Sequence, residues 1–119
     1  QEAIDADDYS GVTFLTYKRD GETYVEAKDF RSFLVYKNMD LTGCNAFECA
    51  MSAPSGDVEI LLADNKTGKV LGKAGGTGTG SLTKFTSFTC DVAAEAGLTE
   101  LRIVFTKQTS LKWFRFYTV

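Results

Sequence analysis

The chain has 119 residues, of which 44% are hydrophobic and 24% charged, and its formal net charge is −3. This length suits one domain over residues 1–119, and no run of about 18 apolar residues suggests a membrane span. The acidic balance argues against nucleic-acid binding, and the lack of histidine removes the commonest general base and metal ligand. The opening residues QEAIDADD have neither the basic nor the apolar region of a signal peptide, so none is predicted there.

Alternation of apolar and polar residues with a period of two dominates the chain and predicts strands. In chain order these are TFLTYK (13–18), SFLVYK (32–37), NAFECAMS (45–52), DVEILLAD (57–64), TKFTSFTCDV (83–92), ELRIVFTK (100–107) and KWFRFYTV (112–119). Turn sequences fall between them, at Asp20-Gly21, Thr42-Gly43, Pro54-Ser55-Gly56 and Thr67-Gly68. The helical candidate is VAAEAGL (92–98), which Gly97 ends within two turns. We therefore predict the all-β class, as an antiparallel β-sandwich.

The glycine-rich segment GKAGGTGTGS (72–81) is similar to a phosphate-binding loop, but the similarity fails at one position. Gly75 and Gly80 have the required spacing, whereas Ser81 stands where the motif needs lysine. Helical periodicity does not follow, so no helix terminus is expected to bind a phosphate. We predict a flexible loop between two strands.

Cys44, Cys49 and Cys90 make an odd number of cysteines, and no Cys-x-x-Cys pair suggests zinc. Cys49 and Cys90 alternate with apolar residues, which favours small core side chains. We predict three unpaired thiols, with a Cys49–Cys90 disulfide as the alternative.

Five segments together resemble carbohydrate-binding module family 6. They are IDADDYSGV (4–12), similar to IEAEDYSGV; LVYKNMDL (34–41), similar to ISYKNVDF; GDVEILLAD (56–64), similar to GGxIEIRLD; FTSFTCDV (85–92), similar to WTTVSCDV; and LKWFRF (111–116), similar to LDWFRF. The matches follow the family's order and span nearly the whole chain. No single one is specific, but five in sequence make the resemblance strong.

The resemblance implies a jelly-roll β-sandwich of the galactose-binding-like type, secreted and without catalytic activity. Such a module binds a polysaccharide or oligosaccharide and holds an attached glycoside hydrolase or related enzyme on its substrate. It implies a monomer that needs no cofactor and contacts neither nucleic acid nor membrane. Sugars stack their C–H faces on aromatic rings while polar neighbours orient them, which suits this composition.

The family's main site is an aromatic clamp in the loops at one end of the sandwich, and it is altered here. Alignment with the family motifs puts Glu26 at the first aromatic position and Leu82 at the second, and Ser110 replaces an asparagine. We define the loop surface as the residues that we expect to bind sugar in this altered site: Tyr24, Glu26, Phe30, Arg31, Leu82 and Ser110. Arg31 and the nearby Lys28 make an acidic glycan a further possible ligand, because a guanidinium binds a carboxylate through two hydrogen bonds.

The resemblance also suggests a structural calcium ion. Asp5 and Asp7 match two acidic ligands of a structural calcium in the family, but Lys112 replaces the third. An ammonium cannot ligate calcium, yet it neutralises carboxylates directly. We predict no metal, with a salt bridge from Lys112 to these aspartates in place of the ion.

The terminal strand carries a second candidate site. Phe114 and Phe116 share one face and are predicted to enter the core, whereas Trp113, Arg115 and Tyr117 share the other. These last three residues are the sheet surface, because some family members bind a second glycan on an outer sheet face. The alternative is a cation–π ladder that merely covers the sheet.

Two other functions compete with glycan binding. One is a structural or protein-interaction domain whose glycan site has been lost. The other is a small carbohydrate-active enzyme, which the missing histidine and the short length disfavour.

Overall fold

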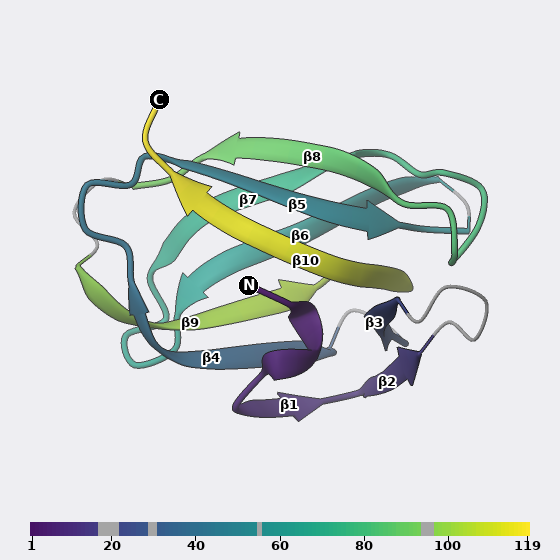
Figure 1. The fold of residues 1–119 in the computed structure, drawn as a ribbon, viewed down its shortest axis with the longest axis horizontal. Coiled ribbons are helices and arrows are strands. Elements are labelled where there is room, and N and C mark those ends of the chain that lie inside the picture. The colour runs from purple at the N-terminus through teal and green to yellow at the C-terminus, as the bar shows by residue number, and fades with distance from the viewer. Residues whose placement is uncertain (17–21, 29–30, 55, 94–96) are drawn as a thin grey trace.

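Two antiparallel five-stranded sheets packed face to face form the structure, a computed structural model that describes residues 1–16, 22–28, 31–54, 56–93 and 97–119 (Figure 1). The β9 sheet has the order β1 (Asp8–Ser10), β4 (Phe33–Asp40), β9 (Leu98–Phe105), β6 (Asp57–Asp64), β7 (Val70–Thr77). The β10 sheet has the order β2 (Val12–Thr16), β3 (Thr23–Ala27), β10 (Thr109–Tyr117), β5 (Ala46–Ser52), β8 (Thr86–Asp91). The predicted jelly-roll β-sandwich is confirmed.

Three of the four predicted turns are confirmed by glycines in the left-handed region of backbone space. Gly43, Gly56 and Gly68 have φ values of 74°, 65° and 76°, which a residue with a Cβ rarely adopts. The Asp20-Gly21 turn and residues 94–96 of the helical candidate lie outside the described residues. A short 3-10 helix at Ala3–Asp5 and the strands β1, β3 and β7 were not among the predicted elements. No helix among the described residues is long and apolar enough to cross a membrane.

The core lies between the sheets and is built by alternate residues of the central strands. On β5, Phe47, Cys49 and Met51 are fully buried and face inward. The ring of Phe114 packs against Phe47, with 5.9 Å between the ring centroids, and edge-on against Tyr36 at 4.8 Å. Burial of each large apolar side chain stabilises the fold by about 1.5–3 kcal/mol. All three cysteine thiols are free in this structure.

A β-bulge in β10 keeps both Leu111 and Phe114 in the core. Leu111 pairs with Met51 of β5 and Trp113 pairs with Ala50, so Lys112 is the extra residue between them. Without an extra residue, positions 111 and 114 would face opposite sides of the sheet. From Trp113 onward the alternation is the predicted one, with Phe114 buried and Phe116 packed against the core.

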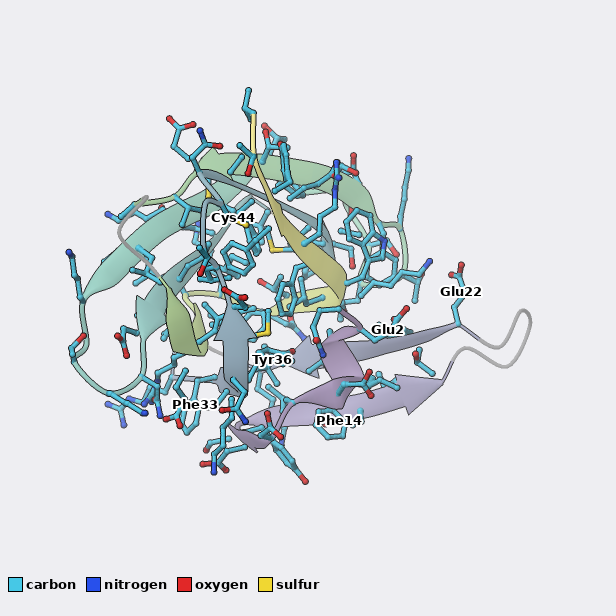
Figure 2. The ribbon with its side chains drawn as sticks, turned by 60° about the vertical axis from the view of Figure 1, so that its left-hand side comes forward. Glu2, Phe14, Glu22, Phe33, Tyr36 and Cys44 are labelled. Carbon is cyan, nitrogen blue, oxygen red and sulfur yellow. The ribbon has the colours of Figure 1, made fainter. Side chains whose placement is uncertain are left out.

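Tyr36 fastens the N-terminal residues to the sandwich (Figure 2). Its buried hydroxyl donates a 2.7 Å hydrogen bond to the carbonyl of Ala3. Burial, together with the nearby carboxylates of Asp5 and Asp7, raises the pKa of Tyr36 far above its usual value. Tyr36 therefore remains a neutral hydrogen-bond donor at any physiological pH.

The loop predicted over residues 72–81 is wrong in its first half, because Gly72–Thr77 belong to β7. The glycines in this segment permit neighbouring strands to approach closely. A Cβ on Gly75 would lie 2.1 Å from the carbonyl oxygen of Val58, and one on Gly72 would lie 2.6 Å from that of Asp91. Glycine in this stretch reflects tight packing of a strand, a reason that a sequence pattern does not reveal.

Candidate functional site

Three loop-surface residues lie together where β10 begins. Ser110 of β10 pairs directly with Glu26 of β3, and Tyr24 points to the same outer face two residues away. Their exposure differs from what a stacking platform requires, because Tyr24 is 7% exposed and Ser110 is 0% exposed, whereas Glu26 is half-buried. The predicted ring and hydroxyl are adjacent, but both are covered.

Ser52, which sequence reasoning did not single out, belongs to the same group. It lies on β5 opposite Ser110 and is likewise fully buried. Neither serine hydroxyl has a hydrogen-bond partner among the described residues. The available signal was weak, because alternation along NAFECAMS puts Ser52 on the outer face but suggests no burial there. We call Glu26, Ser110 and Ser52, which lie side by side across three strands, the polar row.

Phe85 is the second residue that sequence reasoning missed. It directly precedes β8, whose first residue, Thr86, pairs with Met51, so Phe85 lies beside Ser52. Its ring meets the ring of Tyr24 edge-on, with 5.4 Å between centroids and 65° between planes. The signal was its alternation with the outward-facing Ser87, which predicts an outward ring at the end of the strand.

Lys112 lies near the ring of Phe85, and its predicted salt bridge to Asp5 and Asp7 is wrong. Its ammonium lies 2.6 Å from the carboxylate of Glu22 and 5.6 Å from the ring centroid of Phe85. Glu22 extends from the chain just before β3 (Figure 2). The extra residue in β10 explains the difference, because the bulge puts Lys112 beside β3.

Asp7, one of the two predicted partners of Lys112, is bound to β4 of the other sheet. Asp7 accepts a 2.7 Å hydrogen bond from the backbone N–H of Lys37 and donates its own N–H to Val35, both on β4. No group of three or more acidic, cysteine or histidine side chains that could hold a metal occurs within the described part of the chain. Calcium needs six to eight oxygen ligands, and the acidic side chains of the described residues do not supply that set by themselves.

The remaining loop-surface residues are more scattered. Leu82 is half-buried in the segment 78–85 between β7 and β8. Backbone hydrogen bonds tie the start of this segment down, from Gly78 to Gly56 at 2.8 Å and from Gly80 to Ala53 at 3.0 Å. Arg31 is exposed just before β4, whereas Phe30 lies outside the described residues.

In the sheet surface, the side chain of Arg115 already has two partners. The Arg115 guanidinium forms a 2.7 Å ion pair with Glu48 of β5 and lies 4.4 Å from the ring centroid of Tyr117. Trp113 is half-buried, and its backbone forms an isolated antiparallel β-bridge with that of Glu2. Arg115 therefore occupies one side of the Tyr117 ring, as the cation–π alternative predicts.

Comparisons with known proteins agree with this architecture. Residues 2–118 match the profile of the carbohydrate binding module family 6. A family 6 module from Clostridium stercorarium, solved with cellobiose, superposes with a TM-score of 0.90 at 18% identity, over 100% of this chain and 92% of that one. A module from Clostridium cellulolyticum, solved with xylose, has a TM-score of 0.83 at 28% identity, over 97% and 93%.

A third similar structure is a larger enzyme. It is a glycoside hydrolase family 43 arabinoxylan arabinofuranohydrolase from Bacillus subtilis, solved with cellotetraose. The TM-score is 0.88 at 16% identity, and the match covers 100% of this chain but 27% of that one. Since the family profile spans nearly all of it, this chain belongs to carbohydrate binding module family 6, whose members bind carbohydrate and are not enzymes.

Proposed function

We propose that this chain binds a β-linked polysaccharide of glucose or xylose units and holds an attached polysaccharide-degrading enzyme on it outside the cell. The chemistry of the ligands in similar structures, cellobiose and xylose, supports this sugar class. The attached enzyme is supported by the arabinofuranohydrolase, of which this chain matches about a quarter. On this proposal the module acts as a monomer and needs no cofactor.

We assign the sugar site to the loop surface rather than the sheet surface, and the polar row carries this choice. A sugar offers hydroxyls that both donate and accept hydrogen bonds, and hydrophobic C–H faces that stack on aromatic rings. The polar row supplies the Glu26 carboxylate and two serine hydroxyls that have no hydrogen-bond partner among the described residues, and it lies next to the rings of Tyr24 and Phe85. On the sheet surface, by contrast, Arg115 already has Glu48 and Tyr117 as partners.

The expected affinity is weak. With few rings available for stacking, we expect dissociation constants of roughly 0.1–1 mM for short oligosaccharides. An extended polysaccharide would be retained better when several modules or an enzyme bind it together, because linked binding raises the effective concentration.

Affinity electrophoresis on gels containing glucan, xylan or a uronate-containing polysaccharide tests the assignment. The loop variant is Glu26→Gln with Ser110→Ala, two nearly isosteric changes. The first removes a negative charge and replaces an acceptor oxygen by a donor NH2 group, and the second removes a hydroxyl. The matched sheet variant is Arg115→Ala with Tyr117→Ala. We expect the loop variant to lose retention, the sheet variant to keep it, and near-ultraviolet circular dichroism to show both folded.

The opposite pattern would move the site to the outer face of β10. Failure of the wild type to bind any glycan in the panel would instead leave the structural-domain alternative. Retention only on the uronate gel would favour an acidic glycan, for which Lys28 and Arg31 are candidate binding residues.

A further inference from the structure

Beneath the loop surface lie two buried serine hydroxyls without hydrogen-bond partners among the described residues, and we call these two serines the floor. Ser110 and Ser52 face each other across β10 and β5, and both are 0% exposed. Their hydroxyls lack hydrogen-bond partners within the described part of the chain. A buried hydroxyl without a partner costs free energy, so such a pair in a folded protein requires an explanation.

The side chains of two aromatic residues cover these serines from opposite sides, and together they form what we call the roof. Tyr24 lies on β3 and Phe85 directly precedes β8, and these two strands flank β10 and β5. Three strand spacings separate those flanking strands, about 14 Å in all. The ring centroids nevertheless lie only 5.4 Å apart, so both side chains must lean inward over the serines. The apolar faces of aromatic rings exclude water without replacing its hydrogen bonds, which accounts for serine hydroxyls that are both buried and without partners.

The Phe85 side of the roof lies at the protein surface. Phe85 is half-buried, and the Lys112 ammonium near its ring is itself paired with Glu22. Such contacts between partly exposed charged groups are individually weak. Phe85 is therefore a part of the roof that can move without disturbing the core.

We propose that Phe85 is the gate of a latent sugar pocket whose floor is Ser52 and Ser110, an inference that rests on the proposed glycan-binding function. In the free protein the ring of Phe85 closes on Tyr24 and the pocket is shut. When Phe85 turns outward, a pyranose enters, stacks on Tyr24 and forms hydrogen bonds to the two serine hydroxyls. The apparent affinity is then lower than the affinity of the open form, by the fraction of molecules that are open.

The gate is tested first without any sugar, through the accessibility of Tyr24. Nitration by tetranitromethane, with peptide mapping by mass spectrometry, gives the reaction rate of Tyr24 separately from those of other tyrosines. We expect Phe85→Ala to raise that rate roughly tenfold, because the ring of Tyr24 loses its cover. Lys84→Ala, a change at the exposed neighbouring residue, should leave it unchanged.

The second measurement is calorimetric titration with cellotetraose and xylotetraose. We expect Phe85→Ala to bind one of them about threefold or more tighter than wild type, because the open fraction increases. Adding Ser52→Ala and Ser110→Ala in the Phe85→Ala background should abolish this gain. Phe85→Leu provides a variant that keeps an apolar side chain at the surface, should Phe85→Ala fold poorly, and is expected to shift both readouts in the same direction.

Three results would overturn the proposal, and they differ in what they leave standing. An unchanged nitration rate in folded Phe85→Ala would overturn the gate regardless of sugar binding. Weaker sugar binding by a variant whose Tyr24 reacts faster would make Phe85 a stacking platform instead. Faster nitration with no binding of any glycan by either protein would overturn the sugar role together with the proposed function.

Discussion

Ser110 of β10 lies directly opposite Ser52 of β5, and both hydroxyls are shielded from water without a hydrogen-bond partner among the described residues. An unsatisfied buried hydroxyl costs about 1–3 kcal/mol, whereas an apolar replacement of similar shape costs little. We therefore expect Ser52→Ala with Ser110→Ala to raise the free energy of unfolding by about 1 kcal/mol or more. Urea unfolding measures this, with the exposed Ser87→Ala as control. A clear loss of stability would mean that bound water satisfies these hydroxyls.

Alkaline pH should destabilise the fold through buried groups that resist deprotonation. Burial raises the pKa of the Cys49 thiol, and the nearby Cys90 and Glu48 add to the effect. The pKa of Tyr36 is raised in the same way, by burial and by the nearby carboxylates of Asp5 and Asp7. A raised pKa means that the folded state holds its proton more tightly than the unfolded state. Stability is therefore complete below the unfolded values and falls as pH rises above them.

The expected slope is about 1.4 kcal/mol per pH unit for each group, beginning near pH 9 for Cys49 and near pH 10 for Tyr36. Urea unfolding between pH 7 and pH 11 measures it. Cys49→Ala should remove the earlier part of the slope, and Tyr36→Phe the later part. A free energy of unfolding that is flat across this range would contradict the prediction.

Calcium should not stabilise the protein, because the side chains of the described residues offer no complete ligand set. The melting temperature should be the same in calcium chloride and in a chelator. Lys112→Asp should not create calcium dependence either, since Lys112 lies beside Glu22 rather than beside Asp5 and Asp7. A rise in melting temperature with calcium in the wild type would show that backbone oxygens or residues outside the described part complete a site.

Gly11 should tolerate substitution less well than Gly43, although both have φ values near 70°. A Cβ on Gly11 would lie 2.6 Å from the hydroxyl oxygen of the buried Ser32, whereas a Cβ on Gly43 would meet nothing within 4 Å. Both alanine variants carry the left-handed backbone strain of about 1–2 kcal/mol. Gly11→Ala should cost at least about 1 kcal/mol more, by urea unfolding. Equal losses would show that Ser32 moves aside freely.

The strands and their faces were largely predictable from local pattern. A period of two needs only the alternation of side chains along a strand, so the inward position of Phe114 and the outward position of Arg115 follow from KWFRFYTV itself. Turn glycines such as Gly43 and Gly68 are similarly local, because the backbone angle they permit is a property of single residues. The order of five family-like segments supplied the sandwich and the carbohydrate-binding family.

Errors arose wherever position depended on contacts distant in sequence. The glycine-rich segment 72–81 was predicted as a flexible loop, whereas Gly72–Thr77 lie in β7, where the close approach of Val58 and Asp91 requires glycine. Lys112 was assigned to Asp5 and Asp7 by alignment, and the β-bulge instead puts it beside Glu22. A bulge depends on pairing between strands, so a single segment does not reveal it.

By itself, the sequence determined that this protein is a two-layer β structure with an aromatic last strand, and it identified Tyr24, Glu26 and Ser110 as candidates for one site. Only the tertiary structure decided that Ser52 and Phe85 join them, and that Tyr24 and Ser110 are covered. The reason is physical: alternation gives the face of a sheet on which a side chain lies. Exposure on that face depends on what packs over it, and here the covering ring comes from a segment about 60 residues away in the chain.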